Sequence, residues 1–185
     1  MKLVSIVILN WNGRNYLEQF LPALVKHTTL PGAEIVVADN GSVDNSLEFL
    51  KKGYPGVRTI ELEKNHGFSG GYNRAFEQLD AKYMLLLNSD IEVSEHWLEP
   101  MVELMEKDET IAACTPKILD YTRRTHFEYA GAAGGFIDRY GYPFCRGRIF
   151  DHLEEDIGQY KDSTDLFWGS GACLMVRTEL YRDSG

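Results

Sequence analysis

The chain has 185 residues, of which 44% are hydrophobic and 25% charged, a composition typical of one globular domain and unlike that of disordered or fibrous chains. Its formal net charge is −9 at pH 7 and it has no long cluster of Lys and Arg, so nucleic acid is excluded as an expected partner. No apolar run reaches membrane-spanning length, and segment 1–9 lacks the cleavage site of a signal peptide. We therefore expect a cytoplasmic protein, with peripheral contact to the inner face of the membrane left open.

The first half of the chain is expected to form three units of strand, loop and helix. Apolar runs at 3–9, 34–38 and 57–62 are typical of strands, and each ends in a polar loop. Apolar residues recur at spacings of three and four in 14–27, which predicts an amphipathic helix. A second helix is expected at about 45–52, with Asp44 or Ser42 as its cap. This alternation indicates an α/β domain.

The central strand is expected from Tyr83 to Leu87, where five apolar residues without alternation indicate a strand covered on both faces. It stops at Asn88, Ser89 and Asp90. Ligands of open α/β sheets bind at the carboxyl ends of the strands, so we interpret Asp90 as a metal ligand. A divalent cation there would also allow so acidic a protein to bind an anionic substrate. The alternative is an ordinary turn, because these residue types are common turn formers.

The segment 65–73 is a glycine-rich loop that leads into a helix ending at about Leu79. Its glycines are Gly67, Gly70 and Gly71, a spacing that matches neither the dinucleotide-binding fingerprint nor the phosphate-binding loop of ATPases. Small residues at a helix N-terminus can bind phosphate, or they can serve only tight packing of strand and helix. Both interpretations remain open.

The second half of the chain begins with a helix expected from Ser94 to about Lys107 and a short strand at 111–114. The region 121–158 is rich in Arg, Tyr, Phe and Gly, so we expect short strands and loops there, with no helix before about Leu153. It either receives an acceptor or packs its aromatic residues on the sheet. Strand character returns at 166–176 with a break at 169–171, a helix follows from Arg177, and the end at Gly185 has the look of a truncation.

Several segments in this order resemble the family 2 glycosyltransferases, and among them the rhamnosyltransferase-type members. The segments that carry the resemblance are 8–12 (ILNWN), 37–42 (VADNGS), 65–73 (NHGFSGGYN), 87–90 (LNSD) and 171–177 (GACLMVR). The resemblance implies a GT-A (Rossmann-like) fold, in which a mixed, mostly parallel sheet lies between helices in three layers. It implies one domain over 1–185, with a nucleotide-binding half at 1–115 and an acceptor-side part at 116–185.

The resemblance also implies a role for each matching residue. Leu9, Asn10 and Trp11 would line the nucleotide base, with Trp11 either stacking on it or belonging to the core. Asp39 and Asn40 stand where the family has an acidic pair that reads the base, and which of the two does so stays open. Further nucleotide-sugar contacts are implied for Gly70, Asn73, Asn88 and Ser89. Asp90 would hold Mg²⁺ or Mn²⁺, and Trp168 and Gly169 would lie on the acceptor side.

The implied reaction is inverting transfer of a sugar from a UDP- or dTDP-linked nucleotide-diphospho-sugar to a saccharide or lipid-linked acceptor in cell-surface polysaccharide synthesis. The family's catalytic base lies in a Glu-Asp motif, which we expect beyond Gly185, so this chain is expected to transfer poorly or not at all. One alternative is a sugar-phosphate nucleotidyltransferase, although segment 10–14 supplies only one Gly and one Arg to such an enzyme's basic loop. The other is a nucleotide-sugar-binding module without catalysis.

Overall fold

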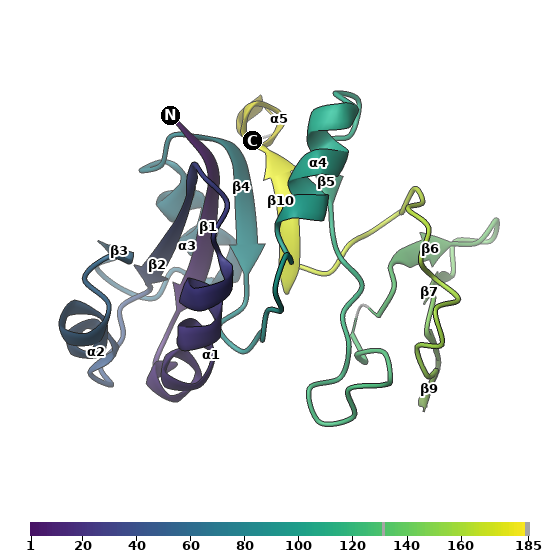
Figure 1. Ribbon diagram of the computed structural model, residues 1–185, viewed down its shortest axis with the longest axis horizontal. Coiled ribbons are helices and arrows are strands. Elements are labelled where there is room, and N and C mark those ends of the chain that lie inside the picture. Colours follow the sequence, from purple (N-terminus) through teal and green to yellow (C-terminus); the bar gives the residue numbers. More distant parts are fainter. Residues whose placement is uncertain (131, 184–185) are drawn as a thin grey trace.

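The computed structural model describes residues 1–130 and 132–183, which form a central sheet of six strands and a smaller sheet of four (Figure 1). The order in the central sheet is β3-β2-β1-β4-β10-β5. Its strands are β1 (Lys2–Asn10), β2 (Ala33–Asp39), β3 (Arg58–Glu61), β4 (Ala81–Leu87), β5 (Ala113–Cys114) and β10 (Cys173–Arg177). The helices are α1 (Arg14–His27), α2 (Ser46–Gly53), α3 (Gly67–Phe76), α4 (Glu99–Lys107) and α5 (Thr178–Asp183).

The central sheet is mixed and mostly parallel, as predicted. Strands β1 to β4 run parallel, and Ile6 of β1 lies between Ile35 of β2 and Leu85 of β4. Strand β10 runs antiparallel to both β4 and β5. Its amino end therefore lies at the edge of the sheet where β1, β2 and β4 have their carboxyl ends.

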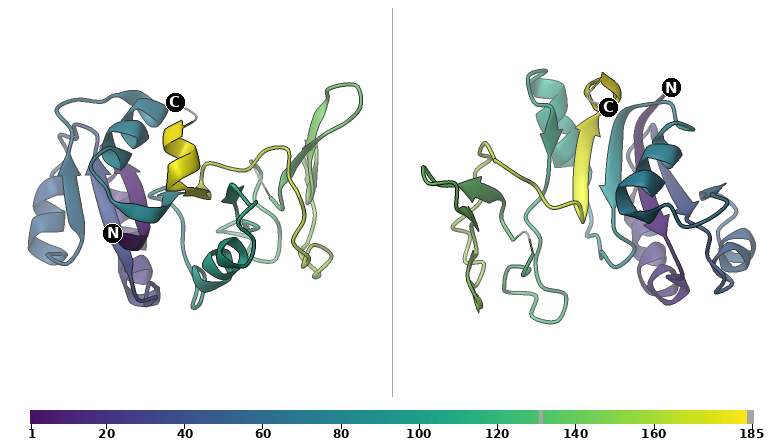
Figure 2. Two further views of the ribbon diagram at one scale, coloured as in Figure 1. Left: turned by 90° about the horizontal axis from the view of Figure 1, so that it is seen from above. Right: turned by 180° about the vertical axis from the view of Figure 1, so that it is seen from behind.

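Helices cover both faces of the central sheet, which confirms the predicted three layers (Figure 2). Successive side chains of a strand point to opposite faces. Ile6 accordingly packs with Leu21 of α1 in one buried cluster, which also contains residues of α2 and α4. Its neighbour Val7 packs in a second cluster with Tyr72 and Phe76 of α3. No described helix has the length and apolarity needed to cross a bilayer.

The smaller sheet lies beside the central sheet, at the end where β5 lies (Figures 1 and 2). Its antiparallel strands, in this order, are β6 (Gly135–Ile137), β7 (Pro143–Cys145), β8 (Arg148–Ile149) and β9 (His152–Leu153). They confirm the short strands predicted for this region. No helix was expected before about Leu153, and none begins at that residue either, because Leu153 pairs with Arg148 and the Glu154 carbonyl accepts a hydrogen bond from the Phe127 N–H.

The largest further differences from the predicted element boundaries are at the starts of α4 and β10. Helix α4 begins at Glu99 rather than at Ser94. His96 has a positive φ of 57°, which interrupts a helix, and Pro100 suits the first turn because its missing N–H has no partner there anyway. Strand β10 begins at Cys173 rather than at Leu166. The backbone before it bonds to the smaller sheet instead, where the Trp168 carbonyl accepts from the Gly135 N–H at 3.1 Å.

Candidate functional site

The loops that follow β1, β2 and β4 meet at one edge of the central sheet, and the turn before β10 joins them there. This is the edge at which open α/β sheets bind ligands. The Asn88 N–H, just after β4, donates to the Ala172 carbonyl, just before β10, at 2.9 Å. The predicted site residues from four distant parts of the sequence are therefore neighbours in the fold.

The ends of β1 and β2 are joined by a buried network of polar side chains. Asn10 is 0% exposed and donates through Nδ2 to Asp39 Oδ2 at 3.0 Å and to Ser42 Oγ at 3.1 Å. The Ser42 N–H donates to Asp39 Oδ1 at 2.9 Å. Both carboxylate oxygens of Asp39 thus have a protein donor, although each retains a lone pair for a further one. Asn10 Oδ1 is buried and has no partner among the described residues.

Asn40 connects the end of β2 to the glycine-rich loop. It is 2% exposed, and its Nδ2 donates to Asn65 Oδ1 and to the Gly67 carbonyl, both at 3.1 Å. Its Oδ1 accepts from the His66 N–H at 2.9 Å. The Asn40 side chain therefore holds the loop that opens α3.

The first turn of α3 lies against the ends of β1 and β2. Gly67 has a φ of +73°, which favours glycine, and its N–H donates to Asn65 Oδ1 at 2.7 Å. A Cβ at Gly71 would lie 2.7 Å from Leu9 Cδ1 and 3.1 Å from Asn40 Nδ2. Gly71 serves close packing of strand and helix, as one interpretation of the glycines predicts. Gly70 is half-buried, and a Cβ there would make only ordinary contacts, at 3.5 Å from His66 Cβ and 3.7 Å from Arg74 Nη1, so packing does not require a glycine at this position.

Asn88, Ser89 and Asp90 follow β4 as predicted. An ideal Cβ on Gly13, in the loop after β1, would lie 3.7 Å from Ser89 Oγ, so these two loops are adjacent. Asp90 is exposed at their edge. Residues 1–130 and 132–183 contain no group of three or more His, Cys, Asp or Glu arranged to hold a metal ion. One carboxylate beside amide and hydroxyl oxygens nevertheless fits Mg²⁺ or Mn²⁺, because such ions keep waters and bind substrate phosphates.

The two tryptophans of the predicted site have different surroundings. Trp11 is 57% exposed, so the alternative of a core residue is wrong. The Trp168 indole lies directly on the backbone of β6, where it occupies the position of a Cβ on Gly135. Gly169 lies against Thr115, whose hydroxyl donates to the Cys173 carbonyl at 2.8 Å. Trp168 therefore anchors the smaller sheet to the segment that leads into β10.

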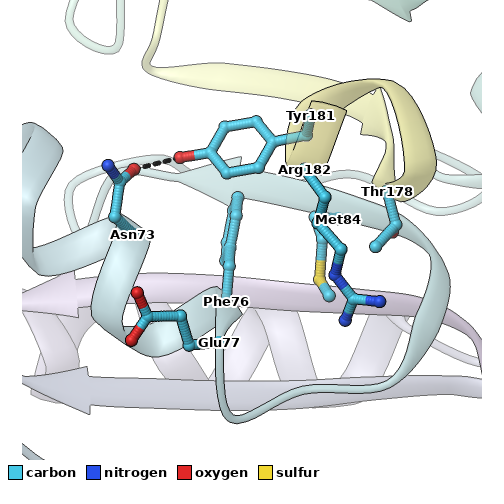
Figure 3. Close-up of a pocket in the computed structure, with 7 residues that line it drawn as sticks. All are labelled: Asn73, Phe76, Glu77, Met84, Thr178, Tyr181 and Arg182. Carbon is cyan, nitrogen blue, oxygen red and sulfur yellow. Dashed lines mark hydrogen bonds between the residues drawn. The ribbon is translucent and has the colours of Figure 1, made fainter. Parts of the chain in front are cut away.

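Asn73 lies further along α3 and faces α5. Its Oδ1 accepts a hydrogen bond from the Tyr181 hydroxyl at the rim of a cavity of about 190 Å³ between the two helices (Figure 3). Phe76 of α3 and Met84 of β4 also line this cavity. The structure thus brings Asn73 together with α5, whereas the other predicted nucleotide-sugar contacts stay at the edge of the sheet.

Comparison with known proteins assigns the chain to a family. The profile of glycosyl transferase family 2 matches residues 5–185. The chain belongs to glycosyl transferase family 2. This membership confirms the resemblance found in the sequence, and the fold agrees with that of solved GT-A enzymes.

Three proteins illustrate what this family 2 chain is similar to. An N-acetylglucosaminyl-diphospho-decaprenol L-rhamnosyltransferase of Mycobacterium tuberculosis is 25% identical over 206 residues, covering 99% of the chain and 64% of the relative. The S. aureus TarS 1-349 structure with UDP-GlcNAc has a TM-score of 0.66 and 20% identity, covering 100% of the chain and 47% of TarS. The mannosyltransferase PcManGT from Pyrobaculum calidifontis, in complex with GDP-Man and Mn²⁺, has a TM-score of 0.64 and 15% identity, covering 98% and 46%. The chain therefore spans about half the length of these proteins.

Three residues that lie at this candidate site were not among the site residues predicted from the sequence. Ser42 Oγ accepts from both Asn10 Nδ2 and the Asn12 N–H, at 3.1 and 2.9 Å. Asn65 links Asn40 to the start of α3. Their position in polar loops directly after strands was the available signal, but the same signal marks ordinary turns. The third, Phe68, lies in the first turn of α3, and its apolar side chain gave no signal of a ligand site in the sequence.

Proposed function

We propose that this family 2 chain is the nucleotide-sugar-binding part of an inverting glycosyltransferase, which moves a sugar from a nucleotide-diphospho-sugar to a saccharide or lipid-linked acceptor. The observation that carries the proposal is the meeting of Asn10, Asp39, Asn40 and Asn88–Asp90 at one edge of the sheet in a chain of this family. Two solved relatives of the same fold hold nucleotide-sugars, UDP-GlcNAc and GDP-Man.

The nucleotide would lie across the ends of β1 and β2. Trp11 offers an exposed ring on which a base can stack, next to Leu9 and Asn10. Asp39 is the acceptor we assign to the base, because its oxygens retain free lone pairs, whereas the Asn40 side chain bonds to Asn65, His66 and Gly67 and so holds the glycine-rich loop. Gly70 would contact the ribose or diphosphate. Asn73 Oδ1 would bind a ligand only if it gave up the hydrogen bond that it accepts from the Tyr181 hydroxyl.

The diphosphate would lie beside the loop after β4. Asp90 would hold Mg²⁺ or Mn²⁺, with Asn88 and Ser89 supplying neutral contacts. A divalent cation, when bound there, neutralises the charge that develops on the leaving diphosphate. The protein's part is to orient the nucleotide so that the anomeric carbon faces the acceptor side. We assign the general base of the reaction to none of the described residues.

The acceptor would approach from the region 116–172, which includes Trp168 and Gly169. The mycobacterial relative is named for a lipid-linked diphospho-sugar acceptor, which supports a role in cell-surface polysaccharide synthesis. Exposed aromatic residues in this region can pack on a saccharide or on the surface of a membrane. Among them are Tyr129, Tyr140, Tyr142, Phe144 and Phe150.

Calorimetric titration of UDP, dTDP and GDP, each with and without Mn²⁺, tests the proposal. We expect one nucleotide to bind in a metal-dependent manner and Asp90→Ala to abolish the metal dependence. Glu95→Ala is the matched control, because Glu95 is another exposed carboxylate of the same loop. Nucleotide binding that depends neither on Mn²⁺ nor on Asp90 would favour a binding module without catalysis. If none of the nucleotides binds, the proposal is refuted.

A further inference from the structure

Phe68 is a large apolar side chain that the fold leaves half in solvent at the edge of the candidate site. The residue is 52% exposed, although the aromatic residues that follow it in α3, Tyr72 and Phe76, are buried. One side of the ring lies against the turn before β10, where an ideal Cβ on Gly171 would be 3.4 Å from Phe68 Cζ. The Phe68 ring therefore connects the first turn of α3 with the segment that contains Gly169 and Trp168.

The position of the Phe68 ring is determined by buried groups. The preceding carbonyl, that of Gly67, accepts from Asn40 Nδ2 at 3.1 Å. The ring packs edge-on against Tyr72, with centroids 4.9 Å apart and planes at 68°. The Tyr72 hydroxyl in turn donates to the carbonyl of Leu87, the last residue of β4, at 3.2 Å. A ring held in this way loses little conformational freedom when a ligand packs on it.

The turn before β10, against which the Phe68 ring packs, is also fixed by hydrogen bonds. The Ala172 N–H donates to Ser170 Oγ at 3.2 Å, and the Ala172 carbonyl accepts from the Asn88 N–H at 2.9 Å. The absence of a side chain at Gly171 leaves the ring uncovered at this point. Phe68 thus packs against a turn that is bonded to Asn88 through Ala172 and that also contains Gly169.

We propose that Phe68 is a specificity-determining residue on which the sugar ring of the donor packs. This inference rests on the proposed function, in which the sugar extends from a diphosphate beside Asp90 toward the acceptor side. The negative face of an aromatic ring attracts the weakly positive C–H groups on one face of a pyranose. Phe68 would therefore add affinity for the sugar and none for the nucleotide.

The test compares each nucleotide with its sugar conjugate by calorimetry in the presence of Mn²⁺. The pairs are UDP with UDP-GlcNAc, GDP with GDP-mannose and dTDP with dTDP-rhamnose. For the pair that binds, we expect Phe68→Ala to reduce the ratio Kd(nucleotide)/Kd(nucleotide-sugar) about three- to tenfold and to leave the Kd of the nucleotide unchanged. Phe68→Leu, which keeps an apolar contact with Tyr72, should give a smaller loss in the same ratio.

Tyr16→Ala is the matched control, because Tyr16 is 51% exposed on α1 and has no role in the proposed site. If no nucleotide binds to the unmodified chain, the proposed function fails and this inference with it. If a nucleotide binds but the sugar adds no affinity, or both Phe68 variants leave the ratio unchanged, the inference alone is overturned. Equal weakening of nucleotide and conjugate would also overturn it, since Phe68 would then only support the loop.

Discussion

Asn10 Nδ2 donates a hydrogen bond to Asp39 Oδ2 at 3.0 Å, and this contact joins the ends of β1 and β2 beneath the candidate site. Both side chains are almost completely buried, at 0% and 1% exposure. The same amide group also donates to Ser42 Oγ, so the Asn10 side chain connects the end of β1 to the loop that follows β2. Changes at Asn10 should therefore affect stability and the site together.

Asn10→Asp should destabilise the fold at neutral pH, because it places a second buried carboxylate next to Asp39. Like charges raise the pKa of such a pair above that of the unfolded chain, so the folded state binds protons more tightly. The loss of stability should be largest above the raised pKa and should diminish as the pH falls through it. Urea unfolding between pH 4 and pH 8 measures this. Asn12→Asp, in the exposed part of the same loop, is the control, and an equal pH dependence in both variants would contradict the prediction.

Gly71→Ala should destabilise the protein by about 1–3 kcal/mol, because the added methyl group meets the Leu9 side chain in a packed region. An ideal Cβ there lies 2.7 Å from Leu9 Cδ1. Gly53→Ala is the matched control, since a Cβ on this glycine of α2 has no atom within 4 Å. It should be neutral or stabilise by up to about 1 kcal/mol. Chemical denaturation measures the free energy of unfolding of both variants. If Gly71→Ala is as stable as the unmodified protein, α3 can shift away from β1.

Arg177→Met should cost about 1.5–3 kcal/mol of stability, because it removes a charged donor from backbone carbonyls at the end of α4. Arg177 Nη2 donates to the Asp108 carbonyl at 2.8 Å, and its Nε donates to the Ile111 carbonyl at 2.7 Å. Arg182→Met serves for comparison, since Arg182 makes one such bond, to the Leu79 carbonyl at 3.0 Å. Thermal unfolding should rank Arg177→Met as the less stable variant. The reverse order would mean that solvent replaces these bonds without cost.

Cys114 and Cys173 should react slowly with iodoacetamide at pH 8 in the folded protein and rapidly in urea. Burial raises the pKa of the Cys114 thiol to about 11 and that of Cys173 to about 12, so almost no thiolate is present. Since the folded pKa values exceed the ordinary value of 9.0, stability should be unaffected below that pH and should fall as the pH rises above it. Mass spectrometry of time-resolved labelling measures the rates. Rapid labelling of Cys173 in the native protein would contradict its burial.

All three cysteines are free. The sequence predicted β1, β2 and β4, because runs of Val, Ile and Leu have few stable alternatives to a strand covered on both faces. It was less accurate where one residue changes the local geometry. His96 with its positive φ moved the start of α4, and Leu153 pairs with Arg148 rather than beginning a helix.

By itself, the sequence determined the layers of the fold, the edge at which polar loops gather and, through its ordered motifs, the family. These properties depend on the periodicity of side chains over a few residues and on short motifs, both of which can be read along the chain. Only the tertiary structure decided that Asn40 holds the glycine-rich loop and that Trp168 packs on Gly135. It also decided that Phe68 packs against Gly171 while remaining partly exposed to solvent. Such partners are distant in the sequence, and they are selected by how the packed sheet and helices bring different loops together.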